Sequence, residues 1–99
     1  MKEEVKRKQK DTIIIILQAL IPYRDQAEWF LEIIKRTDNE KLENKLINMI
    51  YQQVKAIKDS EEIEKIKKNI SEIHNKYEYK EEQDKKDAEK FLDDFINKI

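Results

Sequence analysis

Glycine and cysteine are both absent from this chain of 99 residues, and proline occurs once. Without glycine, the chain has few ways to form the positive-φ turns of a hairpin-rich sheet or a loop that cradles phosphate. Without cysteine, it has no disulfide framework, no thiolate zinc site and no cysteine nucleophile. These absences argue against a sheet protein and favour helices, which aspartate, asparagine and serine can join.

The chain also has no excess of charge of one sign. Charged residues make up 43% of it and apolar residues 38%, yet the net charge is −1. A balanced surface of this kind gives no whole-molecule attraction to nucleic acid or to an anionic membrane. The length is that of one domain with one core, so we expect residues 1–99 to form a single helical-bundle domain.

Helical patterns cover most of the chain. Glutamate repeatedly stands four residues before lysine or arginine, from Glu3–Arg7 to Glu82–Lys86. Each such pair stabilises a helix by about 0.2–0.5 kcal/mol, and the apolar residues recur at the spacing of amphipathic helices. We therefore predict an all-α fold, an antiparallel helical bundle of about four helices. The predicted ranges are roughly 3–20, 22–36, 39–58 and 60–78, the last either continuing or broken into a further helix over 84–98.

Local signals predict where these helices begin. Pro22 suits the first position of the second helix, where its missing N–H costs nothing. Thr37 or Asp38 is predicted to cap the third helix, and Asp59 begins a capping box for the fourth. The polar segment 78–87 has few apolar anchors, so both a hinge and a continuous helix remain open there.

The one long apolar run contains four consecutive isoleucines, Ile13 to Ile16. A strand reading fails because no other segment alternates at period two to pair with it. A secretion signal is opposed by Glu3, Glu4 and Asp11 in the leading segment, and a membrane span would need about twenty residues. We therefore expect a cytoplasmic protein without membrane contact, in which this run is a central helix or completes its burial against another chain.

Catalytic and metal-binding patterns are sparse. His74 is the only histidine, and Glu78 one turn later gives at most two ligands, whereas a metal site needs three or four. We expect His74 to lie partly wet beside the packed stripe of its helix. No serine, histidine and aspartate set suggests nucleophilic catalysis. We expect no enzyme activity, no cofactor and no metal.

Apolar side chains left over from the core suggest contact with other proteins. Trp29 and Phe30 are adjacent, so their side chains point about 100° apart on a helix and one of them lies near the surface. We therefore predict a small adaptor or inhibitor that acts through apolar helix faces and self-associates, with burial of the same residues in one core as the alternative. The predicted interaction residues are Ile14, Ile21, Trp29, Phe91, Phe95 and Ile99.

Two alternatives belong to other classes. A nucleic-acid-binding regulator would use the basic N-terminal segment, through Lys6, Arg7, Lys8 and Lys10, although no aromatic residue is interleaved with these charges. Bacteriocin immunity proteins and small phage- or plasmid-defence proteins share this size and helical style, an analogy of class without a motif. We expect an unidentified protein partner or a homodimer, in preference to nucleic acid.

Overall fold

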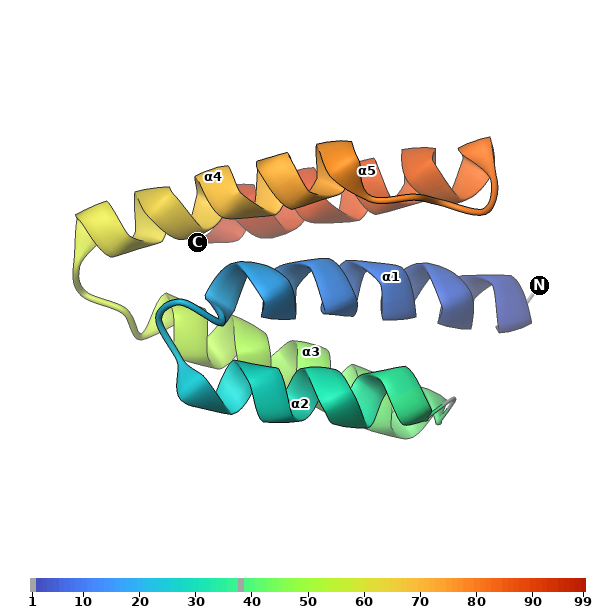
Figure 1. Ribbon diagram of the computed structural model, residues 1–99, viewed down its shortest axis with the longest axis horizontal. Coiled ribbons are helices and arrows are strands. Elements are labelled where there is room, and N and C mark those ends of the chain that lie inside the picture. The colour runs from blue at the N-terminus through green and yellow to red at the C-terminus, as the bar shows by residue number, and fades with distance from the viewer. Residues whose placement is uncertain (1, 38) are drawn as a thin grey trace.

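The residues that the structure describes form five helices. They run along the long axis of the molecule and alternate in direction (Figure 1). The computed structural model describes residues 2–37 and 39–99, and the side chains from residue 10 onward. It confirms the predicted all-α antiparallel bundle, with five helices in place of four. The helices are α1 (Lys2–Leu20), α2 (Asp25–Arg36), α3 (Glu40–Lys55), α4 (Ser60–Lys76) and α5 (Glu82–Lys98).

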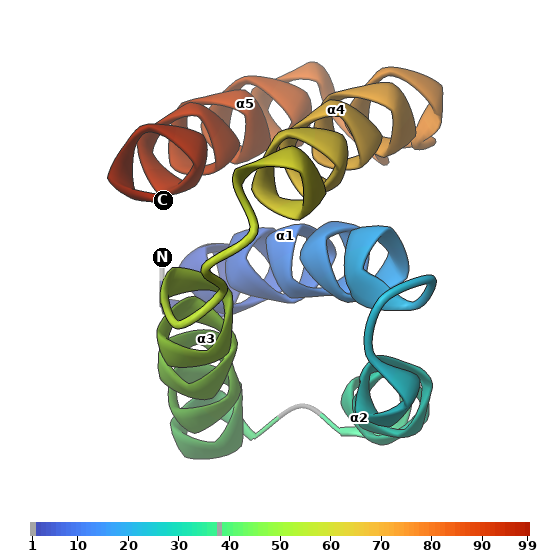
Figure 2. The ribbon, with the colours of Figure 1, turned by 90° about the vertical axis from the view of Figure 1, so that its left-hand side faces the viewer.

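The isoleucine-rich helix α1 lies at the centre of the bundle. Figure 2 shows α4 and α5 on one side of it and α2 and α3 on the other, and α1 packs against all four. Ile13, Ile15 and Ile16 are completely buried, as are Leu17 and Ala19 to within 1% of their surface. A helix that is apolar almost all round is stable only inside such a ring of neighbours. The central-helix prediction is therefore confirmed.

The starts of α3 and α4 are set by side-chain caps. Asp59 accepts hydrogen bonds from the backbone N–H groups two and three residues on, at 3.0 and 3.4 Å, as predicted. Asn39 does the same for α3, at 2.9 and 3.2 Å. The prediction of Thr37 or Asp38 for this cap was wrong for Thr37, which ends α2, while Asp38 lies outside the described residues.

The prediction that Pro22 begins the second helix was also wrong. Pro22 lies in a turn, and α2 begins only at Asp25. The backbone N–H groups of Tyr23 and Arg24 both donate to the Leu20 carbonyl, at 2.9 and 2.8 Å, so they satisfy the free carbonyl end of α1 before the chain turns. Pro22 therefore lies between the end of α1 at Leu20 and the start of α2 at Asp25.

An ion pair ties this turn to α4. Arg24 Nη1 lies 2.9 Å from Glu62 Oε1. Glu62 stands three residues after Asp59, where the glutamate of a capping box lies, and its side chain is directed to Arg24 instead. A partly exposed pair of this kind adds at most about 1 kcal/mol, so its main effect is to orient the α1–α2 connection.

The polar segment before α5 interrupts the helix. Of the two predictions, the hinge is confirmed and the continuous helix was wrong. Helix α4 ends at Lys76, Tyr77 has an extended backbone (φ −71°, ψ 135°), and α5 begins at Glu82, two residues before the predicted start. The Tyr77 hydroxyl donates to Asp11 of α1 at 2.8 Å. This tertiary hydrogen bond favours the bend over a continuous helix.

Candidate interaction surface

Two large apolar side chains are exposed among those that the structure describes. Trp29 on α2 has 63% of its surface exposed, and Met49 on α3 has 45%. A single exposed apolar residue is ordinary on a protein surface. These two are of interest because they lie on helices that border the same slot.

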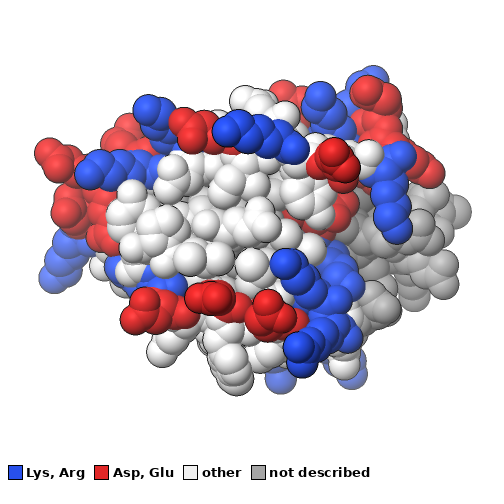
Figure 3. Space-filling model, viewed as in Figure 1, with Lys and Arg blue, Asp and Glu red and all other residues white. Residues whose placement is uncertain are grey.

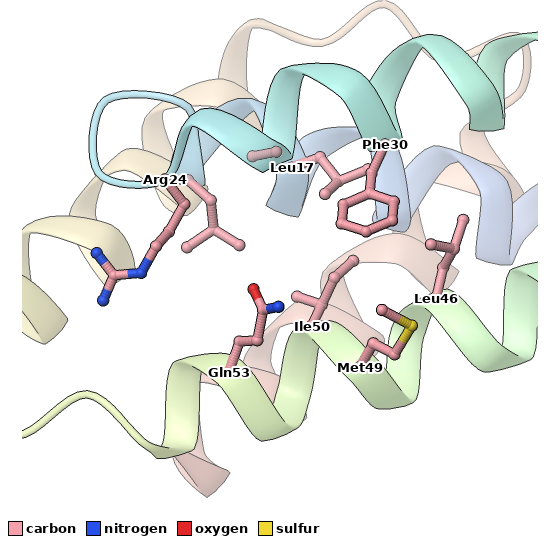
Figure 4. Close-up of a pocket in the computed structure, with 9 residues that line it drawn as sticks. Leu17, Arg24, Phe30, Leu46, Met49, Ile50 and Gln53 are labelled. Carbon is pink, nitrogen blue, oxygen red and sulfur yellow. The ribbon is translucent and has the colours of Figure 1, made fainter.

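The slot is a recess between α2 and α3. Both helices pack on α1 and have few contacts with each other, and Figure 2 shows them on the same side of α1. Phe30 points from α2 toward Ile50 and Met49 of α3 (Figure 4). The Trp29 ring lies beside that of Phe30, with their centroids 5.2 Å apart and their planes tilted by 58°. The slot is lined by Leu17, Leu20, Arg24, Ala27, Phe30, Leu46, Met49, Ile50 and Gln53.

The slot is apolar along most of its length and polar at one end. Arg24 is its one charged lining residue, and Gln53 lies across from it at that end (Figure 4). The bottom has room for about one water molecule. The slot can therefore receive a small apolar side chain, while larger groups would rest on its rims.

The sequence pattern of α3 does not reveal the slot. Met49 stands at helical spacing with the other apolar residues of this helix, whereas the buried face runs through Glu43, Leu46, Ile50 and Val54. Glu43 has only 1% of its surface exposed and makes polar or electrostatic contact within the fold. A glutamate is normally expected on the exposed side of a helix, so the sequence pattern does not predict that Glu43 is buried.

The two predicted residues on α1 lie at its open edge. Ile14 and Ile21 are half-buried and pack against the core, whereas the isoleucines on either side of Ile14 are fully buried. They therefore form part of the surface that α2 and α4 leave uncovered.

The predicted C-terminal face is divided by the structure. Phe95 is buried to within 5% of its surface and packs edge-on against Tyr51, with ring centroids 6.1 Å apart. The prediction that Phe95 is an exposed interaction residue was therefore wrong, because its side chain belongs to the core. Phe91 and Ile99 are half-buried, and Phe91 lines an open groove between α3 and α5 together with Tyr51.

A polar cluster fastens the α4–α5 connection. His74 Nδ1 and the Tyr79 hydroxyl share a hydrogen bond of 2.7 Å, and the rings of Tyr79 and Tyr77 lie 4.7 Å apart. His74 has 8% of its surface exposed, so the expectation that it lies partly wet was wrong. Tyr79 packs against the histidine and closes it off from solvent.

Burial raises the pKa of three groups in this cluster. The pKa of Asp11 is raised, chiefly by burial, although the hydrogen bond from Tyr77 acts in the opposite direction. Burial and the hydrogen bond to Asp11 raise the pKa of Tyr77, and burial also raises that of Tyr79. Both tyrosines are therefore neutral hydrogen-bonding groups at ordinary pH, and not candidate nucleophiles.

The predicted nucleic-acid residues are only partly described. The side chains of Lys6, Arg7 and Lys8 lie outside the described part of the chain. Lys10 and Lys80 line a surface recess in which three carboxyl groups, those of Asp11, Glu78 and Asp84, outnumber them. The acidic neighbours make this recess a poor place for a phosphate.

The described residues contain neither a group of metal ligands nor a membrane-spanning helix. No three histidine, aspartate or glutamate side chains from residue 10 onward are grouped so as to hold a metal ion. None of the helices in the described ranges is both long enough and apolar enough to span a bilayer.

No family model matches this chain, and comparisons with curated proteins and with solved structures gave no match either. A function has therefore to be inferred from the surfaces of the molecule itself.

Proposed function

We propose that this chain is a small non-enzymatic protein–protein interaction module, of the adaptor or inhibitor type, that binds a helix of a partner protein across the α2–α3 slot. The observation that carries the proposal is the exposure of Trp29 and Met49 on the two helices that border the slot. Helices that insert apolar side chains into a groove are a recurring mode of protein recognition.

The residue types at the slot suit this role. Tryptophan is enriched among the residues that dominate binding energy at interfaces, and methionine adapts its shape to a partner. Contact with Phe30 restricts the Trp29 ring before a partner arrives, which lowers the entropy lost on binding. The slot is therefore a partly preorganised surface.

The lining also indicates the chemistry of the partner. The narrow apolar bottom has room for little more than a methyl group, so alanine fits it better than a longer side chain. The Arg24 and Gln53 end offers hydrogen-bond donors, so an acceptor on the partner helix fits there. We propose that the partner segment is an amphipathic helix with small apolar residues along its contact face, and that binding takes place in the cytoplasm.

Photo-crosslinking from position 29 tests the proposal. A photoreactive phenylalanine analogue would replace Trp29 in cells that express the chain, and in a matched control it would replace the exposed Lys90 on α5. We expect irradiation to give a discrete product at position 29 that is absent at position 90, with the attached segment identified by mass spectrometry. That segment is expected to be helical and apolar on one side.

A binding measurement with the identified segment completes the test. We expect Trp29→Ala and Met49→Ala each to weaken binding about tenfold or more, the usual effect of removing an interface anchor. Lys90→Ala is expected to leave binding unchanged. Equal crosslinking at positions 29 and 90, or full binding by Trp29→Ala, would overturn the proposal.

A further inference from the structure

The side chain of Met49 places a sulfur atom at the α2–α3 slot. The sequence contains no cysteine and two methionines, Met1 and Met49. Met49 lines the slot from α3 and has 45% of its surface exposed. With nearly half of this side chain in solvent, dissolved oxidants can reach the thioether, and no thiol in the chain competes for them.

The slot around Met49 is apolar, unlike the outer side of α2. Figure 3 shows charged side chains along α2 on the side that faces away from α3, whereas among the described residues only Arg24 brings a charge to the slot lining. Leu46 and Ile50 flank Met49 on α3, and Phe30 lies opposite on α2 (Figure 4). A thioether suits these neighbours because it is polarizable and only weakly polar. A strongly polar group at the same position would lose contact with water when a partner helix covers the slot.

Gln53 lies one turn after Met49 on the same helix. Residues four apart on a helix are neighbours on one side, and both of these line the slot. The Gln53 amide can donate a hydrogen bond to an oxygen on the Met49 sulfur. Both side chains are exposed, so an added oxygen displaces no core residue. The folded chain can therefore carry methionine sulfoxide at this position.

We propose that Met49 is a modification site, at which oxidation by a peroxide turns off binding at the slot. The inference rests on the proposed function, since it concerns regulation of the same slot. In the reaction, hydrogen peroxide transfers one oxygen atom to a lone pair of the sulfur, and its O–O bond breaks. The thioether is oxidised by two electrons to methionine sulfoxide, and the peroxide is reduced to water. Reductases specific for each sulfoxide epimer reverse the change, so binding can be restored.

The added oxygen opposes binding in two ways. Removing a polar group from water without a compensating hydrogen bond costs free energy, and the apolar face of the partner helix offers no donor. If the sulfoxide instead accepts from Gln53, that amide is no longer available to the hydrogen-bond acceptor of the partner. We therefore expect oxidation of Met49 to weaken binding about tenfold or more.

Peptide mass spectrometry after exposure of the purified chain to hydrogen peroxide tests the chemistry. We expect one added oxygen at Met49, formed at a rate of the same order as in free N-acetylmethionine amide. The circular dichroism spectrum and the urea midpoint are expected to stay as in the untreated chain, because Met49 lies outside the core. Resistance of Met49 to peroxide that fully oxidises the free compound, or unfolding on oxidation, would place the side chain in the interior and overturn the proposal.

Photo-crosslinking from position 29 then tests the effect on the slot. The chain with the photoreactive analogue at position 29 is oxidised, freed of peroxide and irradiated in an extract of the cells that express it. We expect the yield of the crosslinked product to fall about tenfold or more, and to recover after treatment with methionine sulfoxide reductases. Met49→Leu is the matched control, since leucine is apolar and of similar volume but forms no sulfoxide. Its yield, whatever its level, is expected to be the same before and after peroxide.

The proposed function and this inference fail in different ways. If the untreated chain gives no product at position 29 beyond that at position 90, the proposed function is overturned, and this inference with it. If the untreated chain gives the product and oxidation leaves its yield unchanged, the slot binds a partner but Met49 does not regulate it. An equal loss of product from peroxide-treated Met49→Leu would also overturn the inference, because the oxidised group would then be another one.

Discussion

Two apolar segments that lie close together in the chain have different surroundings in the fold. Ile15 and Ile16 of α1 are completely buried, whereas Trp29 on α2 has most of its surface in solvent. The difference follows from the number of helices around each segment. Helix α1 has four neighbours, while α2 packs mainly on α1 and leaves its outer sides open.

The comparison shows that an apolar residue takes its role from the helices around it. A run of isoleucines makes α1 the element on which the others assemble, because most of its sides have to be covered. Of the adjacent residues Trp29 and Phe30, only Phe30 packs inward, where it is half-buried and lines the slot. Trp29 is then available for contact outside the chain. Substitutions in the two segments should therefore differ sharply in their effect on stability.

The largest effect is expected from Ile16→Ala. The side chain is fully buried, so its removal leaves a cavity among α1 and its neighbours and should lower the free energy of unfolding by about 2–5 kcal/mol. Urea unfolding followed by circular dichroism measures this change. A loss below about 1 kcal/mol would mean that the centre of the bundle is not α1.

A smaller effect is expected from Phe30→Ala. Phe30 is half-buried in the slot, so we expect a loss of about 1–3 kcal/mol, below the range for a fully buried phenylalanine. Trp29→Ala is the matched control, with the neighbouring residue and the same helix. Equal losses for the two variants would show that the pair is buried together and would remove the contrast between them.

Asp11→Asn probes the open edge of α1 and has the smallest effect. The pKa of Asp11 is raised in the fold, chiefly by burial, so the folded state binds its proton more tightly than the unfolded chain does. The stability that this proton gives is complete below the ordinary carboxyl pKa and is lost as the pH rises through the folded pKa. Asparagine carries no charge and can still accept from Tyr77.

We therefore expect Asp11→Asn to be as stable as the unmodified chain at pH 7, or more stable by less than about 1 kcal/mol. The difference should vanish below about pH 4. Urea unfolding at the two pH values measures it, with Asp93→Asn on the exposed side of α5 as the control. Lower stability of Asp11→Asn at pH 7 would show that the charged carboxylate stabilises its hydrogen bond with Tyr77.

The sequence was enough to predict the helices and the central position of α1. Periodicity and capping are local properties, so the all-α fold and the Asp59 cap could be read directly. The break before α5 could not be decided, because it depends on the long-range contact between Tyr77 and Asp11. The delayed start of α2 likewise depends on hydrogen bonds that close α1 beyond Leu20.

The candidate surface was harder to predict than the fold. Exposure was expected for one of the two adjacent aromatic residues and is found at Trp29, whereas its role in binding stays a prediction. Met49 was missed, since its exposure depends on how α3 rotates against α1 and on the distance that α2 keeps from α3. Those are properties of packing among three helices, and a single helix's pattern does not contain them.

The most direct test of the contrast between core and contact surface is the free energy of unfolding of the double variant Trp29→Ala, Met49→Ala. Both side chains are exposed, so we predict a value within about 1 kcal/mol of the unmodified chain at the same protein concentration. The two residues would then be free to serve binding without supporting the fold. A loss of about 3 kcal/mol or more, as expected for Ile16→Ala, would place them in the core and remove the basis of the proposed interaction surface.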